Sequence, residues 1–172
     1  MHLQQISAND LSGFSTAREI RSSHQTKIYD KHDLKIEQQR DSLGLVFLIH
    51  HAGRAVGTYR LAPIGHDLTL AERAPNIKDL ISIPGSWEAQ RFVICPDFRS
   101  LKNIMAIYRE IATWLRDNAE ITHVVAICNR RVAALLKRTG LKVLAKEIKL
   151  DNTHSDYFLL SGSVVDICNR LL

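Results

Sequence analysis

The chain has 172 residues, of which 45% are hydrophobic and 24% charged, and these values are typical of one globular domain, residues 1–172, with a proper core. The 23 Lys and Arg outnumber the 18 Asp and Glu and give a formal net charge of +5, so an acidic macromolecule or an anionic substrate is a plausible partner. The basic residues are dispersed and the usual nucleic-acid-binding motifs are absent, which argues against a nucleic-acid partner.

The termini and the cysteines bear on cellular location. Residues 1–10 lack the basic-then-apolar layout of a signal peptide, and no apolar run approaches the ~20 residues that a membrane span needs. Cys95, Cys128 and Cys168 lie in apolar runs without zinc-ligand spacing. We therefore predict a cytoplasmic protein with reduced cysteines, no membrane span and no metal site.

The first third of the chain is predicted to contain a helix and then a β-hairpin. Asn9 or Ser12 is a candidate cap for a helix that runs to about Tyr29 with Leu11 on its apolar face, and the polar run 30–42 predicts a short surface helix or a loop. The apolar runs 43–49 and 55–61 predict two strands joined by a turn at Gly53 and ended by Pro63. One or two short helices are expected within residues 64–86.

The rest of the chain alternates strands with amphipathic helices. The predicted elements are a strand at 87–95, a helix at 100–118 with Ser100 as its N-cap, a strand at 123–128, a helix capped by Asn129 and ended by Gly140, strands at 141–150 and 156–160, and a closing helix at 164–171. This order predicts a mixed α/β layer in which helices can cover both faces of one sheet.

The stretch Trp87-Glu88-Ala89-Gln90-Arg91-Phe92 sets a carboxylate and a guanidinium into an apolar strand. Simple alternation would place Glu88 and Arg91 on opposite faces unless a bulge intervenes, and bulges are over-represented beside active sites. The alternative is an edge strand with a surface Glu and a surface Arg.

Four segments together carry a family resemblance. They are the hairpin end Gly57-Thr58-Tyr59-Arg60-Leu61-Ala62-Pro63, the motif Trp87-Glu88-Ala89-Gln90-Arg91-Phe92, the helix after Arg99, and Arg130-Arg131 with Leu136-Lys137-Arg138-Thr139-Gly140. The chain resembles the GNAT (Gcn5-related N-acyltransferase) fold, and within it the acyl-homoserine-lactone (autoinducer) synthases and the long-chain N-acyl amino acid synthases. The resemblance covers roughly residues 40–145.

The resemblance implies a mixed, mostly antiparallel sheet that splays between its fourth and fifth strands, with helices on both faces. The co-substrate would be acyl-CoA or the acyl-phosphopantetheine of an acyl-carrier protein, with no permanently bound cofactor. Its phosphate would lie at the N-terminus of the helix after the fourth strand, where free N–H groups favour an anion. The implied donor-binding residues are Phe92, Val93, Ile94, Arg99, Ser100, Leu101, Lys102, Asn103, Asn129 and Arg130. The glycines of the usual acetyl-CoA loop are missing, which argues against tight cradling of a CoA pyrophosphate, whereas the single phosphate of a carrier protein's phosphopantetheine asks less of the loop.

The resemblance also implies an acceptor site for a small primary amine. Its residues would be Arg21, Asp41, Arg60 and Arg91, whereas the family's tryptophan after the first helix is absent and Gln38 stands in the other acidic place. Glu88 would be the base, acting directly or through a water, because a protonated amine has no lone pair for attack on the thioester. Arg60 and Arg91 are expected to pair with Asp41 and Glu88, and an ion-paired, purely structural Glu88 is the alternative.

These expectations predict an acyltransferase that moves a fatty acyl group from acyl-carrier protein or acyl-CoA to an amino acid or an S-adenosylmethionine-type amine. Two alternatives remain open at this stage. One is an acetyl-CoA-dependent acetyltransferase of the same fold, and the other is a degenerate, non-catalytic ligand-binding module.

Overall fold

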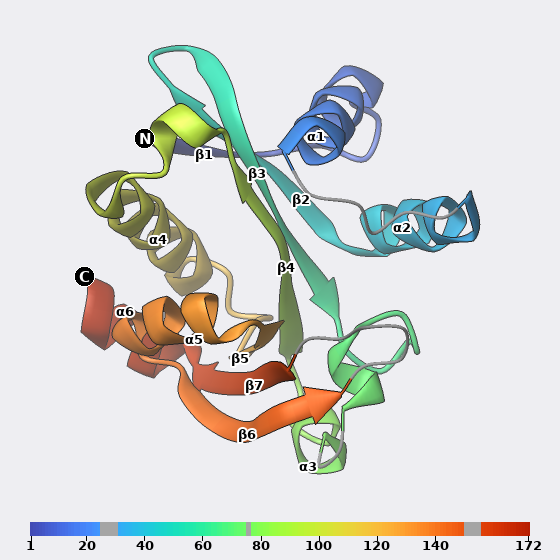
Figure 1. The fold of residues 1–172 in the computed structure, drawn as a ribbon, viewed down its shortest axis with the longest axis vertical. Helices are drawn as coiled ribbons and strands as arrows, with labels where there is room; N and C mark the ends of the chain where they lie inside the picture. Colours follow the sequence, from blue (N-terminus) through green and yellow to red (C-terminus); the bar gives the residue numbers. More distant parts are fainter. Residues whose placement is uncertain (25–30, 75–76, 150–155) are drawn as a thin grey trace. The chain divides into compact units, whose positions relative to one another are not determined.

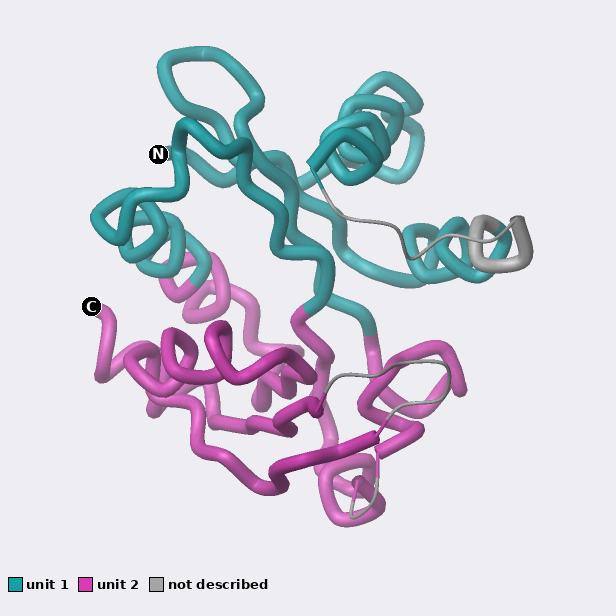
Figure 2. Tube along the Cα trace, in the orientation of Figure 1, with its two compact units in different colours: residues 1–62, 90–111 teal, residues 63–89, 112–172 magenta. Residues whose placement is uncertain are grey.

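A computed structural model describes residues 1–24, 31–74, 77–149 and 156–172 (Figure 1). The chain divides into two compact units: unit 1 comprises Met1–Ala62 and Gln90–Ile111, and unit 2 comprises Pro63–Ala89 and Ala112–Leu172 (Figure 2). Seven strands are hydrogen-bonded in the order β1-β2-β3-β4-β5-β7-β6. The β4–β5 pair is parallel, whereas the β1–β2, β2–β3, β5–β7 and β6–β7 pairs are antiparallel. The predicted mixed, mostly antiparallel α/β class is confirmed.

Unit 1 is built from a meander of strands with helices packed against it. Its elements are β1 (His2–Gln5), α1 (Leu11–His24), α2 (Lys31–Leu43), β2 (Leu45–His51), β3 (Arg54–Pro63), the second half of β4 (Ser86–Ile94), the 3₁₀ turn η2 (Pro96–Phe98) and most of α4 (Leu101–Arg116). The last residue of β3, Pro63, already belongs to unit 2. Ala52 and Gly53 both have positive φ, 49° and 77°, as the predicted tight turn between β2 and β3 requires.

Side-chain alternation along β2 gives unit 1 an apolar layer on each face of its strands. Val46 and Leu48 belong to a cluster with Ala17 and Ile20 of α1. Phe47, between them, lies on the opposite face, where its ring is 5.9 Å from that of Tyr59. The ring of Tyr59 also contacts that of Phe92, and the ring of Phe92 stacks on that of Tyr108 in α4. Helices therefore cover both faces, α1 on one and α4 on the other (Figure 1).

A bulge interrupts the alternation of β4 at Arg91. Arg91 has a φ of 51°, a left-handed conformation that costs a non-glycine residue about 1–3 kcal/mol. Gln90 and Val93 both face the α1 side, because Gln90 bonds Arg60 while Val93 joins the Val46 cluster. Two residues of one face separated by three positions are what a one-residue bulge produces. The side chains of Gln90 and Arg91 therefore point to the same face.

Unit 2 contains the first half of β4, η1 (Ala71–Arg73), α3 (Lys78–Ile81), β5 (His123–Cys128), α5 (Arg130–Leu136), η3 (Lys137–Thr139), β6 (Lys142–Lys149), β7 (Asp156–Ser163) and α6 (Val164–Leu171). Its core cluster is made of Ala71, Ala74, Ile77, Leu80, Val125, Ile148 and Leu159. Pairing between β4 and β5 covers only Ser86–Glu88 with His123–Val125. On its other edge β5 pairs with β7 over its whole length, His123–Cys128.

The boundaries agree with the sequence at several caps and differ at others. Ser100 Oγ accepts from the Asn103 N–H at 3.2 Å, Asn129 Oδ1 accepts from the Val132 N–H at 3.0 Å, and Gly140 has a φ of 101°, so these three predictions are confirmed. The first helix is instead capped by Asp10, whose Oδ1 accepts from the Gly13 N–H at 2.8 Å.

Other predictions at the ends of elements meet different outcomes. Leu11 is 77% exposed and lies off the buried face. β1 was not predicted. The predicted helix end at Tyr29 lies outside the described residues. In the described ranges no helix is long and apolar enough to cross a membrane.

Candidate active site

Glu88 is buried. Its exposed fraction is 1%, which removes the alternative of a surface glutamate on an edge strand. Carboxylate oxygen Oε2 accepts a hydrogen bond from the Ala71 N–H at 2.5 Å. Ala71 is the first residue of η1 and is fully buried, so a buried backbone N–H at the start of this turn faces the carboxylate.

The loop before η1 is folded around a second carboxylate. Oε1 of Glu72 accepts from the N–H groups of Gly65 and Asp67 at 2.8 and 2.9 Å. Its Oε2 accepts from the N–H and the hydroxyl of Thr69 at 2.8 and 2.6 Å. Burial alone would raise the Glu72 pKa, but these four hydrogen bonds hold it below its usual value.

Unit 1 holds a network of four arginines and two carboxylates, all buried except the half-buried Arg91. Asp41 accepts from Arg21 at 2.8 and 2.9 Å and from Arg60 at 2.8 Å. Arg60 is fully buried and also donates to Oε1 of Gln90, at 3.0 Å from Nε and 2.6 Å from Nη2. The acceptor-site residues predicted from the sequence, Arg21, Asp41 and Arg60, are therefore brought into direct contact.

Glu37 joins the fourth predicted residue, Arg91, to this network. Its carboxylate oxygens lie 2.9 and 2.8 Å from Nε and Nη2 of Arg91, 3.1 Å from Arg60 and 2.6 Å from Arg40. Burial acts to raise the Glu37 pKa, but the hydrogen bond from Arg91 and the charges of Arg60 and Arg91 hold it well below its usual range. Glu37, which was not among the predicted site residues, is the other carboxylate of this network, and Gln38 beside it is exposed.

Arg21 carries donors that the network does not use. The side chain is 5% exposed and bonds Asp41 through Nη1. Its Nε and Nη2 are buried without a hydrogen-bond partner among the described residues. Burial lowers the Arg21 pKa, and the charge of Asp41 opposes that shift.

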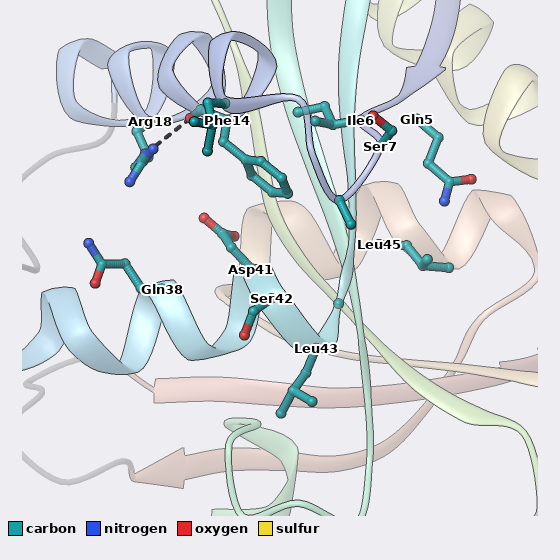
Figure 3. Close-up of a pocket in the computed structure, with 13 residues that line it drawn as sticks. Gln5, Ile6, Ser7, Phe14, Arg18, Gln38, Asp41, Ser42, Leu43 and Leu45 are labelled. Atoms are coloured by element: carbon teal, nitrogen blue, oxygen red, sulfur yellow. Dashed lines mark hydrogen bonds between the residues drawn. The ribbon is translucent and has the colours of Figure 1, made fainter.

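A pocket in unit 1 opens beside Asp41 (Figure 3). Its volume is about 500 Å³. Figure 3 places Asp41 and Gln38 opposite Phe14 and Arg18 of α1. The complete lining is Gln5, Ile6, Ser7, Ala8, Leu11, Phe14, Arg18, Gln38, Asp41, Ser42, Leu43, Gly44 and Leu45. The wall therefore combines an apolar surface with one buried carboxylate.

The predicted donor-binding residues of unit 1 divide into a strand and a helix start. Val93 and Ile94 are buried and Phe92 stacks on Tyr108 with ring centroids 5.1 Å apart, so their side chains belong to the core. Arg99 donates from Nε to the Ile94 carbonyl at 2.7 Å. At the start of α4 the residues Ser100, Leu101 and Lys102 are exposed and Asn103 is half-buried.

The predicted donor residues of unit 2 lie at the start of α5. Asn129 and Arg130 are exposed there, and the Asn129 side chain is occupied by capping. The cysteines are free and half-buried, and burial raises the Cys128 pKa to about 12, which leaves its thiol protonated. Within the described ranges no group of three His, Cys, Asp or Glu could hold a metal ion.

No protein-family model and no curated protein matches the chain. Solved structures do match, and over nearly its whole length. FeeM, an N-acyl amino acid synthase from uncultured soil microbes, is 10% identical with a TM-score of 0.74 and covers 99% of this chain and 94% of its own. A GNAT family acetyltransferase from Elizabethkingia anophelis is 11% identical with a TM-score of 0.64, covering 94% and 96%. The chain has the GNAT fold.

A third match is the CoA-dependent acyl-homoserine lactone synthase BjaI, which is 15% identical with a TM-score of 0.65 and covers 99% of this chain and 87% of its own. The predicted resemblance to N-acyl amino acid and acyl-homoserine lactone synthases is therefore confirmed at the level of the GNAT fold. Identities this low show the fold of the chain and not its reaction.

Sequence reasoning missed two site residues of this GNAT-fold chain. Glu37 lies in a polar run that gave no strong helical periodicity, although Glu37 and Asp41 are four residues apart and so share one face of α2. Glu72 was detectable from the spacing of Thr69-Leu70-Ala71-Glu72, a Thr-x-x-Glu capping signature.

Proposed function

We propose that this GNAT-fold chain is an N-acyltransferase that transfers an acyl group, of fatty length, from acyl-carrier protein or acyl-CoA to a small primary amine. The observation that carries the proposal is the burial of the Glu88 carboxylate beside the Ala71 N–H, on the strand that bulges at Arg91. The similar structures support it, since FeeM is described as an N-acyl amino acid synthase and BjaI as a CoA-dependent acyl-homoserine lactone synthase.

Glu88 is the proposed base. A primary amine is protonated near neutral pH, and its nitrogen can attack only after that proton leaves. The proton passes to the Glu88 carboxylate directly or through one water. The nitrogen then bonds to the thioester carbon, the carbon–sulfur bond breaks, and the leaving thiolate takes up the second proton that the nitrogen loses. The products are an amide and a free thiol.

The bulge of β4 is proposed to supply a hydrogen-bond donor for the thioester oxygen. Negative charge builds on that oxygen during attack and needs a fixed donor. A bulge leaves its extra residue outside the strand ladder and re-aims the neighbouring groups. We assign this role to a backbone N–H between Phe92 and Ile94, a stretch whose side chains pack in the core.

The acceptor amine is proposed to enter the pocket beside Asp41. A cavity of about 500 Å³ holds an amino-acid-sized molecule. Asp41 gives its wall a carboxylate that is paired with Arg21 and Arg60, while Phe14 and Leu45 give it apolar surface. Arg60 links Asp41 to Gln90 of β4, so the pocket wall and the bulged strand form one hydrogen-bonded assembly within unit 1.

The donor phosphate is proposed to bind at the start of α4. This 16-residue helix has no acidic residue in its first turn, and its first N–H groups have no intrahelical partner. Lys102 is exposed in that turn and Arg99 precedes it. A single phosphopantetheine phosphate asks for fewer backbone contacts than a CoA pyrophosphate, which supports a carrier-protein donor.

The direct test is thiol release. The purified protein is incubated with acyl-carrier protein and acyl-CoA donors of several chain lengths and a panel of amino acids and other primary amines, and free thiol and amide product are followed by absorbance and mass spectrometry. We expect amide formation with long-chain donors. Absence of thiol release with every donor would contradict the proposal and favour a non-catalytic binding module.

An acetyl-CoA-dependent acetyltransferase is the second candidate. It is favoured by the similarity to the Elizabethkingia anophelis acetyltransferase, whose structure has acetyl-CoA bound. Mass spectrometry of thioesters that co-purify with the protein separates the two, because a short-chain enzyme would retain acetyl-CoA and not a long-chain donor.

A further inference from the structure

One loop of unit 2, residues 64–74, is held from inside by a single carboxylate. Glu72 gathers three backbone N–H groups and one hydroxyl on its two oxygens, at 2.6 to 2.9 Å. The donors come from Gly65, Asp67 and Thr69, so the carboxylate bonds three residues within a span of five positions of the loop. Charged acceptors make such hydrogen bonds about twice as strong as neutral ones.

The loop needs this restraint because its backbone is strained. Asp67 has a φ of 57°, in the left-handed region. A non-glycine residue in that region costs about 1–3 kcal/mol and persists only where its surroundings hold it. The N–H of Asp67 is itself one of the donors to Glu72, so the strained residue is fixed by the carboxylate.

The same carboxylate sets where η1 begins. Thr69 and Glu72 bond reciprocally: the Thr69 N–H donates to Glu72, and the Glu72 N–H donates to the Thr69 hydroxyl at 3.3 Å. This is the arrangement of a capping box. Thr69 is fully buried, which anchors the turn, and Ala71 lies inside it, between the bonded residues Thr69 and Glu72. The Ala71 N–H is the one that reaches Oε2 of Glu88.

We propose that Glu72 is a positioning residue for Glu88: it folds the 64–74 loop so that the Ala71 N–H fixes the orientation of the Glu88 carboxylate. The inference rests on the proposed function for its catalytic consequence. Without Glu72 the Ala71 N–H no longer has a defined place, and the Glu88 carboxylate loses the hydrogen bond that this N–H donates to Oε2.

Glu72→Gln is the main variant. A glutamine must turn its amide nitrogen toward one of the two donor pairs, because both oxygens of Glu72 accept hydrogen bonds. Thr69→Val is a graded second variant that removes the hydroxyl and keeps the branched shape. Glu120→Gln is the control, since Glu120 is an exposed glutamate of the same unit.

The first readout is amide hydrogen exchange at Ala71, measured by NMR. We expect exchange to be about tenfold faster or more in Glu72→Gln, with an intermediate increase in Thr69→Val and none in Glu120→Gln. Unchanged protection of the Ala71 amide in Glu72→Gln would overturn the inference. This readout does not depend on acyl transfer, so a protein without activity would refute the proposed function and still report on the loop.

The second readout is kinetic. We expect kcat of Glu72→Gln to fall by about tenfold or more with the KM for the amine nearly unchanged, and to fall little further when the change is added to Glu88→Gln. A merely structural role would lower the amount of folded enzyme in both backgrounds equally. Equal, additive losses in the two backgrounds would therefore contradict a positioning role.

Discussion

The Glu37 carboxylate forms ion pairs with three arginines inside unit 1. Four arginines, of which Arg91 is half-buried, lie with two buried carboxylates there, which leaves an excess of two positive charges. Removing one partner of a buried ionic network leaves the remaining charges uncompensated and costs about 3–5 kcal/mol. Glu37→Gln is therefore expected to lower the free energy of unfolding by about 3 kcal/mol or more at pH 7, measured by urea denaturation.

The same variant predicts a pH dependence. The Glu37 pKa is held below its unfolded value, so its contribution is complete above the unfolded pKa of about 4.3 and is lost as the pH falls from there toward the folded pKa. The stability difference between wild type and Glu37→Gln should narrow below about pH 5. A difference that stays constant from pH 7 to pH 3 would exclude this carboxylate as the source.

A substitution at Arg60 that keeps the positive charge tests the hydrogen-bond geometry of its guanidinium. Its guanidinium bonds Asp41, Glu37 and Gln90 at once, and the single ammonium of lysine cannot reproduce that fork. Arg60→Lys should destabilise the protein by about 2 kcal/mol or more. Arg54→Lys, at an exposed position, should change the urea midpoint little. Equal midpoints for the two variants would argue that the fork is dispensable.

These residues mark the limit of sequence-based inference at the residue scale. Glu88 could be predicted because a carboxylate in an apolar strand is conspicuous. Glu37 could not, since polar residues surround it and its burial depends on Arg60 and Arg91, which are distant in sequence. The partner expected for Arg60 was found, whereas the contact of Arg91 with Glu37 was not foreseen.

At the scale of elements, β3 and β4 approach so closely that one position must be glycine. A Cβ on Gly57 would lie 2.6 Å from the Val93 carbonyl oxygen and 2.6 Å from Cδ1 of Ile94. Gly57→Ala should therefore destabilise the protein by about 1–3 kcal/mol, measured by thermal or urea unfolding.

A second variant in the same hairpin should change the stability of the protein in the opposite direction. Ala52 has a φ of 49°, which glycine adopts without steric cost. Ala52→Gly should raise stability by up to about 1 kcal/mol. A loss of stability in Ala52→Gly as large as that in Gly57→Ala would contradict the backbone argument.

Elements were predictable where periodicity and caps coincide. The helices α4 and α6 and the strand β5 have strong apolar patterns, and Ser100, Asn129 and Gly140 mark the boundaries of α4 and α5 as predicted. β1 was missed because its residues, His-Leu-Gln-Gln, are mostly polar and exposed. Its strand conformation comes from pairing with β2, which a local pattern cannot reveal.

At the scale of the whole molecule, the GNAT fold was accessible from the joint occurrence of short motifs. It persists at 10% to 15% identity to the solved structures, because alternating apolar layers constrain residue class more than residue identity. The acyl donor and the amine depend on the shape of the binding surfaces, and no motif encodes that shape.

The net charge of +5 carries a prediction about the donor. If an acidic carrier protein delivers the acyl group, kcat/KM with that donor should fall as ionic strength rises, because salt screens the attraction that speeds encounter. The uncharged acyl-pantetheine thioester of the same chain length is the control and should respond little. Equal salt dependence for the two donors would argue against carrier-protein recognition by charge.

The central claim is that Glu88 removes the amine proton. The most direct measurement compares amine-dependent thiol release by wild type, Glu88→Gln and the exposed control Glu120→Gln, with folding checked by circular dichroism. Loss of a general base lowers the rate by about 10²–10⁴-fold, so we predict a fall of that size in Glu88→Gln and near wild-type rates in Glu120→Gln. Full activity in a correctly folded Glu88→Gln protein would contradict the account.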